Sequence, residues 1–312
     1  MRIVFFGTPE LSVPALATVA RRHELTALVC QPDKPKGRSK TPQPPPAKEW
    51  ALAHGIEVYQ PERLNAGAFE AWLRGQAPDV CCLFAYGRIL KQAILDIPEH
   101  GFLNVHPSLL PRHRGMSPIQ TPIMQGDSVT GVTIMRMDAG MDTGDILLQR
   151  ETPIRPDDTA VTLGERLARM AAHLLLKALD LVEAGEAEYT PQDENLATYT
   201  HRIERETGYI GWDQPARAIH DLVRAMQPWP VAQCRLEGEV CKIHETALTN
   251  EPAMAPPGTV VRIEDGRALV AARDKLLGIT RFQAPGRKAM PMADFLRGHP
   301  LEPGDRFEDM TR

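Results

Sequence analysis

At 312 residues the chain can form two domains, and a hydrophobic content of 43% is enough to fill a sizeable core. Its formal net charge of −4 argues against a protein coated in basic surface for non-specific nucleic-acid binding, although it leaves room for a local basic patch. The five cysteines include no Cys-x-x-Cys pair, and no stretch reaches ~18 apolar residues, so we expect no disulfide framework, no membrane span and a cytoplasmic location.

The first half of the chain alternates short apolar runs with segments of helical spacing. We predict strands at 2–7, 25–31, 56–60, 79–87 and 101–106, and helices at 15–22, 46–55 and 66–75. The opening run RIVFFG is too short for a signal peptide and is typical of a buried strand. This βαβα order predicts the α/β class, with a doubly wound and mostly parallel sheet that binds ligands at the carboxyl ends of its strands.

The first predicted strand ends in the sequence FGTPE. We interpret Thr8 as the cap of the first helix, with Pro9 at the first helical position. The sequence is not G-x-G-x-x-G, and the chain has no P-loop lysine motif. We therefore predict neither NAD nor ATP as a ligand.

A proline-rich loop follows the second predicted strand, with the sequence QPDKPKGRSKTPQPPPAK at 31–48. It sets five basic residues against a single acidic one, Asp33: Lys34, Lys36, Arg38, Lys40 and Lys48. Loops of this length are usually functional or disordered. Two interpretations stay open, a solvated mobile loop and a flexible basic finger that clamps a phosphate backbone.

The sequence NVHPSLLPRHRG at 104–115 follows the strand at 101–106. Asn104 and His106 alternate along that strand, so their side chains point to the same side. A glycine-rich loop downstream, MDAGMDTGD, contributes Asp138, Asp142 and Asp145. A histidine exchanges protons near neutral pH, a carboxylate selects its tautomer, and an asparagine amide stabilises an oxyanion. An Asn, a His and an Asp that converge at strand ends are therefore suited to acyl-group chemistry.

Other interpretations of these polar residues are weaker. His106 taken alone could be a satisfied core histidine. With Asp142 and Asp145 it could bind a metal, but no H-x-x-x-H or Cys/His pair supports a metal site, and we predict none. Ser108 lacks the strand-turn-helix elbow of a nucleophile. For Arg112 and Arg114, a structural ion pair is favoured over a phosphate contact.

The second half begins with two predicted strands, at 129–138 and 145–154, and a long amphipathic helix at 159–185 whose leucines should pack on the sheet. A polar, weakly periodic stretch follows, which we interpret as a linker. We therefore predict a catalytic domain over 1–188, a linker over 189–208 and a C-terminal domain over 209–312.

The C-terminal hundred residues differ in character from the first half. After a helix at 214–227 we predict short strands at 232–238, 239–248, 258–265, 267–273 and 275–283, which indicates a small OB-like β-barrel. Such barrels often bind nucleic acid. However, the 14 Lys and Arg residues from Tyr209 to Arg312 are balanced by 14 Asp and Glu residues, which weakens that interpretation.

Three motifs resemble the formyltetrahydrofolate-dependent formyltransferases: Asn104-Val105-His106, Ser108-Leu109-Leu110-Pro111-Arg112 and Asp142-Thr143-Gly144. The likeness runs nearly end to end through FGTPE, QPDKPKGR, AYGRIL, RGMSPIQ, GVTIMRMDAGMDTGDIL, YTPQDE, QPWPVA and GRKAM. It implies a nucleotide-fold first domain and an OB-like second domain. The basic loop and the C-terminal module point to members of the family that act on transfer RNA.

The resemblance also implies an activity and its site. The reaction moves a formyl group from 10-formyltetrahydrofolate to the α-amine of methionine on initiator transfer RNA, for translation initiation, without a metal. The family's catalytic trio falls on Asn104, His106 and Asp142. The implied folate-binding residues are Phe84, Tyr86, Gly87, Ile89, Leu90, Ser108, Leu109, Leu110, Pro111, Met137, Asp138 and Gly140. The implied tRNA-binding residues are Lys34, Lys36, Arg38 and Lys40. We expect the chain to act as a monomer.

Two alternatives remain. A formyltransferase acting on an amino-sugar nucleotide shares the first domain and the trio, but the basic loop and the lack of an attached dehydrogenase domain argue against it. A non-catalytic RNA- or folate-binding protein is the other. The intact Asn/His/Asp set argues against that alternative, because a binding protein does not need these groups.

Overall fold

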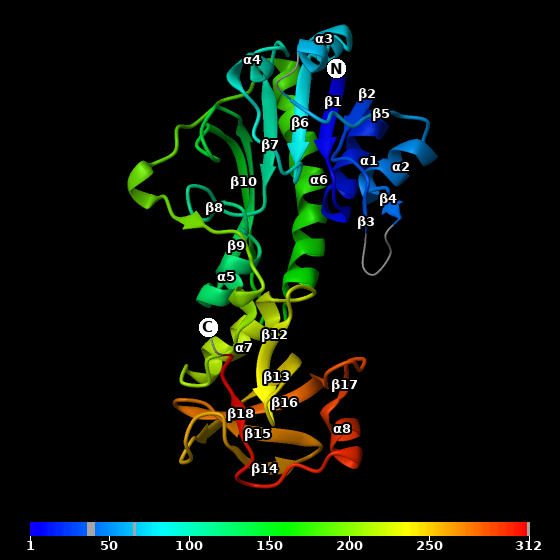
Figure 1. Cartoon of the computed structure of the whole chain (residues 1–312). Helices are drawn as coiled ribbons and strands as arrows, with labels where there is room; N and C mark the ends of the chain where they lie inside the picture. The colour runs from blue at the N-terminus through cyan, green and yellow to red at the C-terminus, as the bar shows by residue number, and fades with distance from the viewer. Residues whose placement is uncertain (36–40, 65–66, 311–312) are drawn as a thin grey trace. The chain divides into compact units, whose positions relative to one another are not determined.

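The computed structural model describes residues 1–35, 41–64 and 67–310. The described chain forms two compact units, and each is built from separate stretches of sequence (Figure 1). The first unit comprises residues 1–118, 129–153 and 164–200. The second comprises residues 119–128, 154–163 and 201–312.

The first unit contains a seven-stranded sheet in the order β10-β9-β7-β6-β1-β2-β5 (Figure 1). Five neighbouring strands run parallel: β1 Arg2–Gly7, β2 Glu24–Val29, β5 Glu57–Tyr59, β6 Val80–Phe84 and β7 Phe102–His106. Two antiparallel strands complete the sheet: β9 Val129–Arg136 and β10 Ile146–Pro153. Every residue of β6 and β7 is buried, because a central parallel strand is covered on both faces. The predicted mostly parallel sheet is confirmed.

Helices and short strand pairs complete this unit. The helical elements are η1 Glu10–Ser12, α1 Val13–Arg22, α2 Pro46–Ala53, α3 Gly67–Gly75, α4 Gln92–Leu95, α6 Ala160–Ala184 (from Gly164 onward) and η2 Glu194–Leu196. The short pairs are β3 Lys34–Pro35 with β4 Pro42–Gln43, and β8 Arg114–Gly115 with β11 Tyr199–Thr200. In α6, fully buried residues recur every three or four positions, as the predicted amphipathic helix requires.

The interpretation of Thr8 as a helix cap is wrong. α1 begins at Val13 with Ser12 as its N-cap, and Pro9 is the N-cap of the short turn η1. The Thr8 hydroxyl accepts a hydrogen bond from the backbone N–H of Gln31 (3.3 Å) and donates one to the Tyr86 carbonyl (3.4 Å). Thr8 therefore connects the ends of three strands, which is a long-range role that the FGTPE motif does not reveal.

The polar segment 189–200 is attached to the first unit by backbone hydrogen bonds. Thr190 and Ile146 exchange two bonds of 2.8 Å. Further along, β11 pairs in parallel with β8, so that Tyr199 lies beside Arg114 and Thr200 beside Gly115. This segment therefore contacts the end of the stretch NVHPSLLPRHRG, at Arg114 and Gly115, and the residue that follows the loop MDAGMDTGD, Ile146.

The second unit is a curled antiparallel sheet with helices. Its strand order is β14-β15-β16-β13-β12-β18, with β17 paired to β16. The strands are β12 Ala232–Leu236, β13 Glu239–Pro252, β14 Val260–Glu264, β15 Arg267–Ala271, β16 Lys275–Gln283, β17 Met290–Pro291 and β18 Phe307–Glu308. The helical elements are α5 Gln120–Gln125, η3 Glu206–Gly208, α7 Ala216–Ala225 and α8 Met292–Gly298. The predicted small β-barrel is confirmed as a curled sheet.

The core of the second unit forms between the concave sheet and α7. Trp212, Val223, Phe282 and Phe307 are among its buried members. All five cysteines of the chain are buried as free thiols, as expected of small hydrophobic residues. No helix in the described ranges is both long and apolar enough to cross a membrane.

Candidate active site

The two polar residues of β7 lie at the carboxyl end of a central strand. β7 pairs with β6 on one side and with β9 on the other, with Asn104 opposite Met135 and His106 opposite Thr133. Their alternation along β7 directs both side chains to the same face. Asn104 is 6% exposed and His106 is 4% exposed. Two polar side chains are thus held rigidly one strand away from the point where the strand order reverses, between β1 and β6.

Asp142 joins this pair from the loop between β9 and β10. Its Oδ1 accepts a hydrogen bond from Asn104 Nδ2 (3.3 Å) and lies 3.6 Å from His106 Nδ1. Its Oδ2 accepts a hydrogen bond from the backbone N–H of Gly115 (2.8 Å). The structure therefore brings Asn104, His106 and Asp142 together, although 38 positions separate Asn104 from Asp142.

The hydrogen bonds of His106 assign roles to its two ring nitrogens. Nε2 lies 2.9 Å from the backbone carbonyl of His113. A carbonyl only accepts hydrogen bonds, so Nε2 carries the proton in the neutral ring and Nδ1 presents a lone pair toward Asp142. A second proton would bind at Nδ1, beside the carboxylate. Nδ1 is therefore the nitrogen that can exchange protons in this site.

The loop that carries Asp142 is closed by its own side chains. The Asp138 carboxylate accepts hydrogen bonds from the backbone N–H of Gly140 (3.0 Å) and from the Thr143 hydroxyl (2.7 Å). A Cβ on Gly144 would lie 1.8 Å from the Arg136 carbonyl oxygen, so only glycine permits this close approach. These contacts make residues 137–145 a compact loop.

The segment Ser108–Pro111 is connected to β9 and β10. The Thr133 hydroxyl donates to the Ser108 carbonyl (2.7 Å) and accepts from the Leu110 N–H (3.1 Å), while Gln149 Nε2 donates to the Leu110 carbonyl (2.7 Å). Ser108 and Leu110 are buried, whereas Leu109 and Pro111 are partly exposed. Ser108 and Leu110 therefore hold the shape of the segment, whereas Leu109 and Pro111 supply its exposed surface.

The stretch 84–90 likewise contains both buried and exposed side chains. Phe84, Tyr86 and Leu90 are buried, and the Tyr86 ring packs edge-on against Phe6 at 5.4 Å between ring centroids. Burial raises the pKa of Tyr86 to about 12, so this phenol stays protonated. Ile89 is 84% exposed. Ile89 therefore presents apolar surface in the loop that follows the carboxyl end of β6.

Only the first of the four predicted tRNA-binding residues lies within the described chain. Lys34 is exposed at the start of the β3–β4 hairpin, opposite Gln43. Lys48 is partly buried and forms an ion pair with Asp33 at 2.8 Å. Lys36, Arg38 and Lys40 lie outside the described residues.

Several groups around the trio were not anticipated from the sequence. They are the His113 carbonyl, the Gly115 N–H and the side chain of Gln192, whose Nε2 donates to the backbone carbonyls of Asp142 (2.9 Å) and Gly144 (2.7 Å). The expectation of an ion pair for Arg114 is confirmed by Glu194 at 2.7 Å. Backbone groups have no signature in the sequence. Gln192 lies in YTPQDE, one of the stretches that carry the resemblance, but no local pattern shows that this side chain contacts the Asp142 loop.

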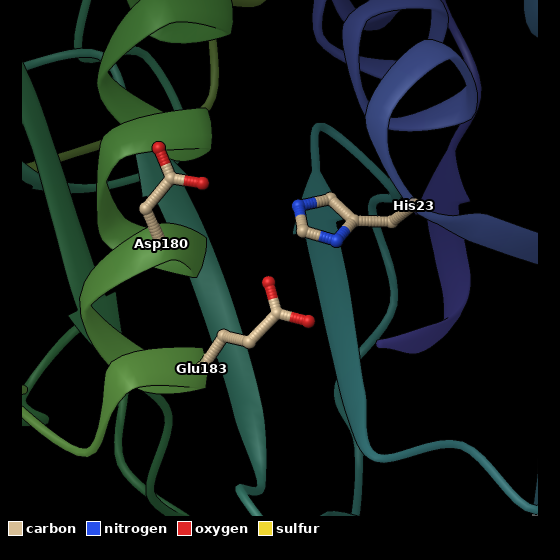
Figure 2. Close-up of side chains that lie close together, drawn as sticks. All are labelled: His23, Asp180 and Glu183. Carbon is tan, nitrogen blue, oxygen red and sulfur yellow. The ribbon is translucent and has the colours of Figure 1, made fainter.

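Possible metal ligands gather elsewhere. Within the described parts of the chain, a single group of three, His23, Asp180 and Glu183, has its ligand atoms within 4.8 Å of one another (Figure 2). Glu183 Oε1 already lies 3.1 Å from the amino nitrogen of Met1, so this ion pair compensates the charge of one of the two carboxylates. Asp145, considered above as a metal ligand with His106, instead lies 3.7 Å from Arg136 Nη2. We assign no metal to the site of the trio.

Two family models match the chain. The formyl transferase model matches residues 1–179, and the model of the formyl transferase C-terminal domain matches residues 202–300. A methionyl-tRNA formyltransferase of Moorella thermoacetica is 43% identical over 307 residues, which cover 98% of each chain. One of Thermus thermophilus is 41% identical over 308 residues, which cover 98% of this chain and 99% of the relative.

Solved structures show the same fold. HypX from Aquifex aeolicus, in complex with tetrahydrofolic acid, superposes with a TM-score of 0.66 at 22% identity and covers 100% of this chain and 51% of that one. WlaRD, a sugar 3N-formyl transferase, has a TM-score of 0.68 at 19% identity and covers 92% of this chain and 99% of its own. The two family models together match most of the chain, and the curated relatives are more than 40% identical to it over nearly its full length. We conclude that the chain belongs to the formyl transferase family.

Proposed function

We infer that this chain transfers a formyl group from 10-formyltetrahydrofolate to the α-amine of methionyl initiator tRNA, in support of translation initiation. The observation that carries this inference is the convergence of Asn104, His106 and Asp142 at the end of β7, in a chain more than 40% identical over nearly its whole length to methionyl-tRNA formyltransferases. We further propose that the protein is monomeric and cytoplasmic.

We propose direct transfer without a covalent enzyme intermediate. The neutral methionyl amine attacks the formyl carbon, and the carbonyl oxygen becomes an oxyanion. Asn104 Nδ2 has a second hydrogen beyond the one that points to Asp142, and this hydrogen can bind the oxyanion. His106, protonated at Nδ1, donates the other hydrogen bond, and Asp142 compensates the positive charge of the ring. When the bond from carbon to N10 of the folate breaks, the amine proton moves to N10, directly or through water.

Different parts of the site would bind the folate and the tRNA. For the folate, the exposed side chain of Ile89 and the partly exposed Leu109 and Pro111 supply apolar surface for a flat pterin ring. The buried Ser108 and Leu110 act by shaping that surface. For the tRNA, contacts from Lys34, Lys36, Arg38 and Lys40 to phosphates would dominate and would be sensitive to salt.

The three candidate functions differ in which acceptor, if any, receives the formyl group. We would incubate the protein with labelled 10-formyltetrahydrofolate and, in parallel, with methionyl-tRNA, an amino-sugar nucleotide or no acceptor. We expect label only on the methionyl-tRNA. Label on the sugar would indicate the amino-sugar activity, whereas folate binding without transfer to either acceptor would indicate a binding protein.

A further inference from the structure

We propose that Gln192 and Arg114 are positioning residues for Asp142, which makes the segment 189–200 part of the catalytic machinery. The proposal rests on the proposed function, because it assigns these residues a task only if Asp142 takes part in formyl transfer. Four features of the structure support this role: the hydrogen bonds of Gln192, the burial of Arg114, the backbone conformation of Asp142 and the cavity beside its loop.

The hydrogen bonds of Gln192 connect Arg114 to the backbone on both sides of Thr143. Its Oε1 accepts from Arg114 Nε (3.1 Å) and Nη2 (2.9 Å), while its Nε2 donates to the carbonyls of Asp142 (2.9 Å) and Gly144 (2.7 Å). A guanidinium has only donors and a carbonyl only accepts, so the amide fits in a single orientation. All four bonds are satisfied at once, and the amide is locked in place.

Arg114 is the immobile residue to which Gln192 is hydrogen-bonded. Its side chain is completely buried, with Nη1 and Nη2 bound to the two carboxylate oxygens of Glu194 at 2.9 and 2.7 Å, and Nη1 also contacts the Tyr199 hydroxyl at 3.2 Å. A bidentate arginine–carboxylate pair holds both groups in a defined geometry. All of these partners come from the segment 189–200. Arg114 therefore fastens this segment beside Gly115, whose N–H binds Asp142.

Asp142 needs such support because of its backbone. Its φ angle is +56°, in the left-handed region that few residues other than glycine adopt, although aspartate adopts it more readily than most. A conformation of this kind persists only where the surrounding structure imposes it. The Gln192 amide binds the Asp142 carbonyl itself, on the peptide that follows this strained residue. It therefore acts on the part of the loop that sets the direction of the carboxylate.

The loop lacks close packing on another side. A cavity of about 650 Å³ is lined by both ends of the loop, including Met137, Asp138, Gly144 and Asp145, and none of the trio lines it. Residues 138–141 of the loop are exposed, so the hydrogen bonds from Gln192 to the Asp142 and Gly144 carbonyls hold a part of the chain that has little apolar packing. Without them we expect the loop to move and the carboxylate to leave its position beside Asn104 and His106, with the fold intact.

The test compares Gln192→Ala and Gln192→Glu in the full-length protein. The glutamate keeps an acceptor for Arg114 but loses both donors to the loop and places negative charge against two carbonyls, so it separates loop positioning from the anchoring of the segment. We expect either variant to lower kcat by about 10²-fold, as a misplacement of about 1 Å can do, and to change the KM for folate by a smaller factor, because Met137, Asp138 and Gly140 of the same loop are among the implied folate-binding residues. Gln233→Ala is the matched control, because this buried amide also faces two backbone carbonyls, in the second unit.

A double mutant separates positioning from a general structural role. In an Asp142→Ala background, measured by single turnover with excess enzyme, adding Gln192→Glu should change the rate by less than about twofold, because the group it positions is gone. Additive losses would overturn the proposal, as would wild-type kcat in Gln192→Glu when Asp142→Ala is impaired. If Asp142→Ala alone retained wild-type turnover, the proposed function's assignment of Asp142 would fail instead, and the positioning role with it.

Discussion

Replacement of Asn104 by alanine tests the proposed chemistry most directly. The side chain is buried, and its Nδ2 binds Asp142 Oδ1. The truncation removes that bond and the second amide hydrogen that we assign to the oxyanion. Asp142 keeps its bond from the Gly115 N–H and remains close to His106, so the rest of the site should hold its geometry.

The expected loss follows from what the amide does in each state. Removal of one oxyanion donor usually lowers kcat by ~10²–10³, which corresponds to roughly 2.7–4 kcal/mol of transition-state stabilisation. In the folded ground state the same side chain donates one observed hydrogen bond to a carboxylate, so its removal should lower the free energy of unfolding by about 1.5–3 kcal/mol. The loss in turnover should therefore be measured under conditions where denaturation shows the variant to be folded.

The assay measures formylation of methionyl-tRNA at saturating acceptor and varied 10-formyltetrahydrofolate, together with chemical denaturation of the same preparation. We expect a KM for folate close to that of wild type. Asn250→Ala, at an exposed position of β13, is the control for an asparagine truncation elsewhere. Near-wild-type turnover in Asn104→Ala would refute the assignment of an oxyanion donor to this residue.

Three further predictions concern the basic loop, the Asp142 loop and the pH dependence of stability. Arg38→Ala should raise the KM for charged tRNA and reduce the salt dependence of binding by about one phosphate contact, with folate binding unchanged; an unchanged KM for tRNA would contradict a role for this loop. Gly144→Ala should lower kcat by about 10²-fold, because its Cβ would lie 1.8 Å from a backbone carbonyl oxygen, whereas Gly75→Ala, with nothing within 4 Å, should leave kcat unchanged. Burial, followed by the charge of Arg224, lowers the pKa of His220 from its ordinary value of 6.5, so the unfolded chain takes up a proton more readily than the folded chain. The free energy of unfolding should therefore fall as the pH drops below 6.5. In denaturation curves measured across this pH range, the free energy of unfolding of His220→Gln should fall less steeply than that of wild type. An equally steep fall in the variant would exclude this histidine as the cause.

Local sequence patterns were sufficient for much of the first unit. The strands β1, β2, β6 and β7 are mostly apolar, since parallel strands buried on both faces leave few positions for polar residues. The polar residues of β1 and β2 stand at or near the start of each strand, whereas Asn104 and His106 stand toward the end of β7, which makes them conspicuous in the sequence. Because strand residues two apart face the same side, their convergence could be predicted without the structure.

The chain by itself thus determined which elements form and which side chains carry reactive groups, because periodicity and turn chemistry act over a few residues. Tertiary structure alone decided what holds those groups in place. Thr8 binds Tyr86 instead of capping a helix, the His113 carbonyl selects the tautomer of His106, and Gln192 reaches Asp142 across 50 positions of the chain. Each of these contacts joins a side chain to a backbone carbonyl and leaves no local pattern, because the partners come together only when the sheet has formed and, for Gln192, when the segment 189–200 has folded against the Asp142 loop.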